Sequence, residues 1–277
     1  MFLKLHYLMT KLLTDQLGKT HFFASTPNRI VSLVPSQTET LVDLGLEKSI
    51  VGITKFCVHP IHLKKEKTIV GGTKNINIEK IKALNPDIII CNKEENTKEI
   101  IENLSHICPV WVTDIVKLES NNKMILDFAD IFDVKINANK MIEVINYKLL
   151  QIRNLLKNNS PKNVAYLIWK NPWMAVGHST YINEMLLLNN LNSVFNNAQI
   201  FESRYPEFEF DKLKNLALDY IFLSSEPYPF KQKEALDIQN LTGVKTILVD
   251  GEMFSWHGSR LIKALDYFAE VHEQIVD

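Results

Sequence analysis

The feature that most constrains this chain is an alternation of strand-like and helix-like segments that occurs twice. The first alternation begins with the β-branched run at residues 29–34 and continues to an apolar strand at 110–112. The second occupies residues 163–275. Such alternation is typical of parallel sheets, because a crossover helix returns the chain before the next parallel strand can pair. The sequence therefore predicts an α/β fold of two Rossmann-like lobes, each with a central, mostly parallel sheet.

The individual elements follow from apolar periodicity and from helix end signals. Ser36, followed three residues later by Glu39, has the spacing of a capping box, which predicts that a helix begins at Ser36 and ends near Gly45. We expect strands at 49–53, 87–91, 163–169, 220–224 and 241–248, helices at 78–84, 97–104, 180–188, 210–216 and 259–275, and a hairpin at 13–23.

Between the two alternations lies one long amphipathic segment. Apolar residues recur at helical spacing from 137 to 157, which predicts a long helix. It could join the two lobes or lie on the surface of one, and the pattern alone favours neither. The domains we expect are a hairpin segment at 1–27, an N-terminal α/β lobe at 28–120, a linker region with the long backbone helix at 121–160, and a C-terminal α/β lobe at 161–277.

Composition excludes several classes of function. Lys and Arg number 31 against 32 Asp and Glu, a net charge of −1 that argues against nucleic-acid binding. The chain has three cysteines and no CxxC pair, which indicates reduced thiols and not a disulfide framework. No apolar run is long enough for a membrane span. Residues 1–9 are apolar but are interrupted by Lys4 and His6, with no cleavage site. We therefore expect a cytoplasmic protein, or a periplasmic one if the true start differs.

The candidate chemistry lies in loops that directly follow predicted strands, where α/β proteins place their ligands. These loops carry aromatic, hydroxyl and amide groups and no catalytic motif, which is the chemistry of holding a large planar ligand. Cys57, His59 and His62 could ligate a metal, but a closed zinc site needs four ligands and no second pair occurs at suitable spacing. A loop that presents Phe56 and an imidazole is favoured, and no metal ligands are assigned.

Two blocks of the first lobe resemble one family of binding proteins. Residues 29–39 look like the opening strand and helix of the helical-backbone substrate-binding proteins of ABC importers, which take up cobalamin, haem and ferric siderophores. Residues 71–73 and 78–90, with their L-x-P-D motif, are similar to that family's next block. The second lobe matches around Gly177 and Thr180. The resemblance extends over nearly the whole chain, and its closest branch is the cobalamin-binding one.

The resemblance implies a monomeric, non-enzymatic receptor that binds a corrinoid or related metal chelate in a cleft between two lobes and needs no cofactor. It also implies an ABC permease as partner, docked through Glu99 and Asp211, although Lys98 occupies the neighbouring position. The alternative is a cytosolic corrinoid- or metal-handling enzyme or chaperone that uses Cys57, His59 and His257. The candidate ligand-binding residues, from the resemblance or from the loops, are Pro35, Ser36, Phe56, His59, Thr73, Trp169, Trp173, Tyr205, Glu226, Trp256, His257 and Arg260.

Overall fold

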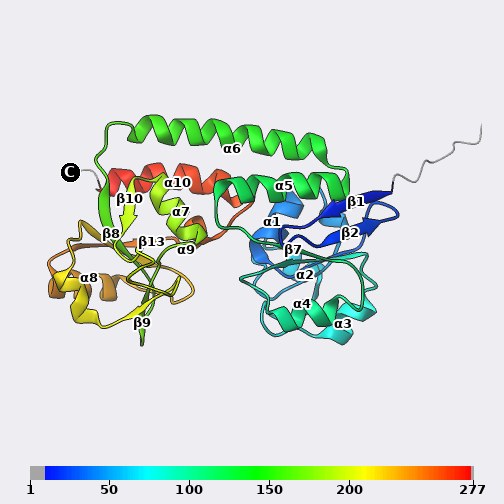
Figure 1. Ribbon diagram of the computed structural model, residues 1–277, viewed down its shortest axis with the longest axis horizontal. Helices are drawn as coiled ribbons and strands as arrows, with labels where there is room; N and C mark the ends of the chain where they lie inside the picture. The colour runs from blue at the N-terminus through cyan, green and yellow to red at the C-terminus, as the bar shows by residue number, and fades with distance from the viewer. Residues whose placement is uncertain (1–9, 276–277) are drawn as a thin grey trace, which may run out of the picture. The chain divides into compact units, whose positions relative to one another are not determined.

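The computed structural model describes residues 10–275 and contains two compact units (Figure 1). Within the described residues, unit 1 comprises the chain up to Ile115, Glu119–Glu143 and His257–Arg260, and unit 2 comprises Val116–Leu118, Val144–Trp256 and the chain from Leu261. Residues 1–9, on which the expectation of no export signal depends, lie outside the described residues.

The sheet of unit 1 is parallel throughout. Its strands are β3 (Ile30–Ser32), β4 (Ile50–Ile53), β5 (Thr68–Ile69), β6 (Ile88–Asn92) and β7 (Val110–Thr113). They lie in the order β5-β4-β3-β6-β7, so the strand order reverses between β3 and β6. In open parallel sheets of this kind, ligands bind beyond the carboxyl ends of the strands near such a reversal. The carboxyl edge of this sheet, where the loops after its parallel strands gather, is therefore the expected place for a ligand.

Helices cover both faces of this sheet. They are α1 (Pro35–Asp43), α2 (Leu63–Glu66), α3 (Ile78–Ala83), α4 (Lys98–Leu104) and α5 (Leu118–Phe132), with a 3₁₀ turn η1 (Glu47–Ser49) before β4. Figure 1 shows α3 and α4 along one face and α1 and α5 on the other. On the first face Val31 and Ile89 pack with Ile81 of α3 and Leu104 of α4, all fully buried. The predicted hairpin is present as β1 (Lys11–Thr14) and β2 (Thr20–Phe23).

The sheet of unit 2 is mixed. Its strands are β8 (Lys162–Trp169), β9 (Trp173–Ala175), β10 (Leu191–Ser193), β11 (Glu207–Phe208), β12 (Tyr220–Ser224) and β13 (Lys245–Val249). The order is β11-β9-β8-β12-β13; β9 and β11 are antiparallel to their neighbours, and β10 pairs with the start of β8. The carboxyl ends of β8, β12 and β13 therefore share one edge, because these three strands are parallel.

The helices of unit 2 enclose this sheet. They are α7 (Tyr181–Leu188), η2 (Phe210–Asn215), α8 (Gln232–Thr242), α9 (Gly251–Ser255) and α10 (Arg260–Ile275). On one face Leu167 and Ile221 pack with Ile238 of α8. On the other, Phe254 of α9 lies 4.8 Å, centroid to centroid, from Phe268 of α10.

The long helix predicted at 137–157 is α6 (Lys135–Leu156), which belongs to unit 1 up to Glu143 and to unit 2 from Val144. No helix within residues 10–275 has both the length and the apolar character needed to cross a membrane.

Several local predictions were wrong. The capping box at Ser36 is absent: α1 begins at Pro35, its N-cap is Val34, and no side chain caps it. Proline suits the first helical position because its missing N–H would have no partner there. The segment predicted as a helix at 210–216 is the 3₁₀ helix η2, and the strand predicted at 241–248 is the end of α8 followed by β13. Helix α5 was not predicted at all.

Candidate functional site

In unit 1 the loops after β4 and β5 meet at the carboxyl edge of the sheet. Lys55 N donates to Gly71 O over 2.8 Å, which holds the two loops together. Phe56 is 49% exposed, with the Lys55 ammonium 5.0 Å from its ring centre. A Cβ at Gly71, whose φ is +127°, would approach Asn75 O to 2.5 Å, so this turn requires glycine. The two loops border an open depression of about 910 Å³.

Thr73 lines the same depression, and its backbone is held from a third loop. Asn96, just after β6, donates from Nδ2 to Thr73 O over 2.9 Å and accepts from Asn92 N through Oδ1. His59 follows Phe56 in the β4 loop and is half-buried. Unit 1 therefore presents an exposed aromatic face, a hydroxyl and a lysine ammonium at one edge.

In unit 2 an aromatic pair marks the corresponding edge. Trp169 ends β8 and Tyr228 follows β12, and their ring centroids lie 5.8 Å apart in an edge-to-face arrangement at 75°. Trp169 is 38% exposed, which leaves much of its surface for a ligand. Trp173 differs, because it stacks on Phe230 at 6.1 Å and lies 5.1 Å from Phe210. The two tryptophans, both candidate ligand-binding residues, therefore have different surroundings.

Glu226 and Trp256 contact each other within unit 2. Glu226 Oε1 accepts from Ser255 Oγ over 2.7 Å and from Trp256 Nε1 over 3.2 Å. Burial raises the pKa of Glu226, against the effect of the hydrogen bond from Ser255. The Trp256 side chain is only 9% exposed. Glu226 is half-buried, so the carboxylate is the more accessible member of the pair.

Ser36, His257 and Arg260 are buried inside unit 1. Gln37 Nε2 donates to His257 Nε2 over 3.0 Å, and Ser36 Oγ lies 3.3 Å from the same nitrogen. Burial lowers the pKa of His257 to about 4. Arg260 Nε donates to Glu39 Oε2 over 2.8 Å, and both side chains are 4% exposed. These contacts join the segment 257–260 to helix α1. That Ser36, His257 and Arg260 contact a ligand stays a prediction.

Pro35 and Tyr205 are half-buried, and the guanidinium of Arg204 lies 5.8 Å from the Tyr205 ring centre. The predicted docking residues are both exposed: Glu99 lies in the first turn of α4, and Asp211, in η2, accepts from Lys214 Nζ over 2.7 Å.

The alternative of metal chemistry at Cys57, His59 and His257 gains no support. Cys57 is fully buried, its Sγ lies 3.2 Å from Thr38 Oγ1, and burial raises the pKa of its thiol. Among residues 10–275, these three side chains do not form a group with ligand atoms in mutual reach.

Two residues of the candidate site, the exposed Lys55 and the half-buried Tyr228, were missed by sequence reasoning. Lys55 immediately precedes Phe56, and Tyr228 lies in the loop that supplied Glu226. The signal that could have identified them was their position in the loops after β4 and β12, because α/β proteins bind ligands in the loops that follow parallel strands.

Comparison with known proteins identifies the class. The family model described as "Periplasmic binding protein" matches residues 30–249, most of the chain. The chain therefore belongs to this family, which confirms the family inferred from the sequence motifs. An uncharacterized ABC transporter substrate-binding lipoprotein of Bacillus subtilis, YvrC, is 25% identical over 88% of this chain and 79% of its own length.

Solved structures agree on the fold. The periplasmic vitamin B12-binding protein BtuF of Vibrio cholerae has a TM-score of 0.75 at 18% identity, over 90% of this chain and 98% of its own. The periplasmic heme-binding protein RhuT of Roseiflexus sp. RS-1, in apo form, has a TM-score of 0.76 at 18% identity, over 90% and 99%. The predicted two-lobed α/β fold is confirmed. The expected cytoplasmic location finds no support, because these relatives are named as periplasmic proteins or a lipoprotein.

Proposed function

We propose that this protein is the substrate-binding component of an ABC importer and that its ligand is a corrinoid such as cobalamin. Membership of the periplasmic binding protein family supports the general role. The vitamin B12- and heme-binding relatives support a flat metal chelate as the ligand class. Like the named relatives, the protein acts outside the cytoplasm in this proposal. It acts by binding alone, as a monomer without a resident cofactor, and releases its ligand chemically unchanged.

The observation that carries the proposal is the presence of exposed aromatic rings at the carboxyl edge of each sheet. Phe56 supplies such a ring in unit 1, and Trp169 supplies one in unit 2, with the half-buried ring of Tyr228 packed edge-to-face beside it. An exposed aromatic face gains free energy by covering an apolar macrocycle, and polar groups around it set the orientation. Thr73 and the Lys55 ammonium beside Phe56 in unit 1, and Glu226, in the same loop as Tyr228 in unit 2, are suited to that second task.

A direct titration tests the proposal. The purified full chain is titrated with cyanocobalamin, cobinamide, haemin and a ferric siderophore, and binding is followed by tryptophan fluorescence and by the ligand's absorbance. We expect saturable binding of the two corrinoids, tighter than that of haemin. Failure to bind any of the four contradicts the receptor role, and preference for haemin or the ferric siderophore contradicts the corrinoid. Recovery of a chemically altered ligand would contradict binding without catalysis.

Two variants locate the site. Trp169→Ala and Phe56→Ala should each weaken corrinoid binding by about 1–3 kcal/mol, the scale of an aromatic contact at an interface. Because both rings are substantially exposed, the melting temperature should change little. Leu236→Ala, on α8 of unit 2 and 51% exposed, is the matched control and should leave binding unchanged. Wild-type affinity in both aromatic variants would place the ligand elsewhere.

A further inference from the structure

A second group of side chains lies at the opposite edge of the unit 1 sheet. Glu47 belongs to η1, directly before β4, and Glu66 ends α2, shortly before β5. His62 is the N-cap residue of α2. Phe56 and Thr73, by contrast, follow β4 and β5. Because these strands are parallel, the Glu47–His62–Glu66 group lies at their amino ends, away from the edge proposed to bind the corrinoid.

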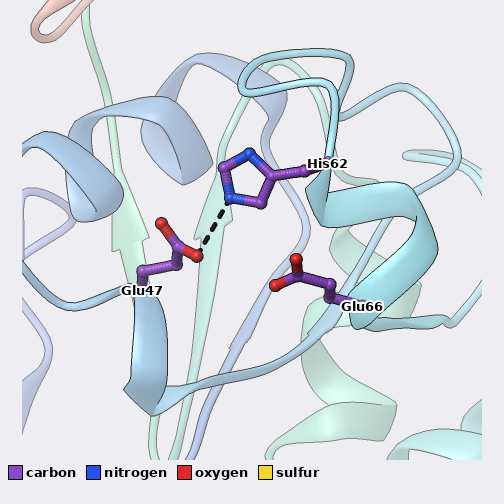
Figure 2. Close-up of side chains that lie close together, drawn as sticks. All are labelled: Glu47, His62 and Glu66. Atoms are coloured by element: carbon purple, nitrogen blue, oxygen red, sulfur yellow. Dashed lines mark hydrogen bonds and ion pairs between the residues drawn. The ribbon is translucent and has the colours of Figure 1, made fainter.

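The three side chains converge. His62 Nε2 lies 2.9 Å from Glu47 Oε1. One ligand atom from each of Glu47, His62 and Glu66 lies within 4.8 Å of the other two. Figure 2 shows the Glu66 carboxylate directed toward the His62–Glu47 pair. A tetrahedral zinc ion with bonds of about 2.0–2.2 Å separates its ligands by roughly 3.4 Å. To hold zinc, the His62–Glu47 pair opens from 2.9 Å toward that separation and Glu66 adjusts to it, and all three side chains are partly or fully exposed.

The backbone beneath the group is well anchored. Leu63, next to His62, is fully buried, and Leu63 N donates to Pro60 O over 3.2 Å. Lys67 Nζ donates to Glu47 O over 2.8 Å, which ties the end of α2 to η1. That ammonium is engaged with a backbone carbonyl. Ligands on a fixed backbone lose less conformational freedom when they bind an ion, because only their side chains must be ordered.

We propose that Glu47, His62 and Glu66 form a binding site for a divalent cation of the zinc class. Two carboxylates and one neutral imidazole offset the charge of such an ion. The imidazole favours zinc and similar metals over calcium and magnesium, which prefer oxygen ligands throughout. Three protein ligands leave a fourth tetrahedral position for water, as in open zinc sites.

The test is zinc binding by the full chain after chelator treatment and dialysis. Isothermal titration with ZnCl₂ should give one equivalent bound with a sub-millimolar Kd, and saturating zinc should raise the melting temperature. His62→Ala should abolish this binding. Glu66→Gln should weaken it at least about tenfold, the lower end of the effect of losing even an outer-shell partner. Co²⁺ should give a visible absorption band in the wild-type protein that His62→Ala lacks.

His106→Ala is the matched control, because His106 is an exposed histidine of unit 1 outside the group. It should bind zinc as the wild type does. Melting curves without zinc establish that each variant is folded; if His62→Ala is not, Glu47→Gln takes its place, with a loss of at least tenfold expected. Absence of wild-type binding, or binding undiminished in the folded variants, overturns the proposal. The corrinoid titration does not affect this outcome, because no corrinoid is present.

Discussion

His257 is a histidine that its surroundings keep neutral. It is buried in unit 1, accepts a hydrogen bond from Gln37, and burial lowers its pKa from 6.5 to about 4. Between these two pH values the unfolded chain binds a proton that the folded chain does not. Stability therefore rises with pH across this window, is fully present above pH 6.5, and is lost as pH falls toward 4. At about 1.4 kcal/mol per pKa unit, the effect is on the order of 3 kcal/mol.

We predict that His257→Gln flattens this acid dependence. The glutamine carries no proton between pH 4 and 6.5, and its side-chain oxygen can still accept from Gln37. Urea unfolding at several pH values across the window measures the slope. His106→Gln, at an exposed position, should retain the wild-type slope. His272, whose pKa is also lowered by burial, contributes an acid dependence that both variants keep. An unchanged slope in His257→Gln would contradict the neutral imidazole.

At the scale of elements, the short segment between α9 and α10 is held by α1 and α5. Ser259 N donates to Thr40 Oγ1 over 3.0 Å, and Gly258 N donates to Asn121 Oδ1. Gly258 has a φ of +84°, and a Cβ there would lie 1.9 Å from Thr40 Oγ1. No side chain fits at this position, so the attachment of residues 257–260 to unit 1 depends on glycine.

Gly258→Ala should therefore destabilise the protein more than Gly243→Ala does. Gly243 also has a positive φ, +71°, but its Cβ would meet nothing within 4 Å. Both variants incur about 1–2 kcal/mol for a left-handed backbone. Gly258→Ala should lose about 1–3 kcal/mol more through overpacking. Urea unfolding measures the free energy of unfolding of both variants, and the difference between their losses is the contribution of the steric clash with Thr40. Equal losses in the two variants would contradict this clash and show that Thr40 moves aside at no cost in stability.

The elements predictable from sequence were those with strong local periodicity. Strands β3, β4, β6, β7, β8 and β12 and helices α3, α4, α6, α7 and α10 follow from it closely. Helix α5 was missed because its first turns are polar, with buried apolar residues concentrated from Met124 onward. Helix α8 was missed because only Ala235 and Ile238 are buried in it, which leaves a weak apolar stripe.

The site was predictable at the level of loops, not of individual side chains. The predicted strand ends place Phe56 and Trp169 at the carboxyl edges, where the structure has Phe56 in the loop after β4 and Trp169 as the last residue of β8, both exposed. Trp256 was expected to contact the ligand, yet it is 9% exposed and bonded to Glu226, thirty residues away in sequence. Such burial depends on contacts between distant segments, which no local pattern encodes. Its ligand contact stays a prediction.

At the scale of the whole molecule, a receptor of this family must also meet a permease. Glu99 in α4 of unit 1 and Asp211 in η2 of unit 2 are exposed acidic residues, one on each unit. In the proposed role they would meet basic residues of the permease, and exposed charge pairs of this kind mainly govern encounter and specificity. Glu99 and Asp211 lie outside the segments that carry the aromatic rings proposed to bind the ligand, so docking and ligand binding should be separable by mutation.

The double variant Glu99→Lys/Asp211→Lys should therefore lose transport and keep its ligand. We expect uptake of cyanocobalamin by cells that depend on this protein to fall at least about tenfold, since like charges opposed across an interface cost several kcal/mol. Corrinoid affinity and melting temperature should stay at wild-type values, because both side chains are exposed. Glu102→Lys, also exposed and on α4, is the matched control for a reversed charge and should transport normally. Normal uptake by the double variant would mean that the permease contacts other residues, and loss of affinity would mean that these two carboxylates act on the ligand.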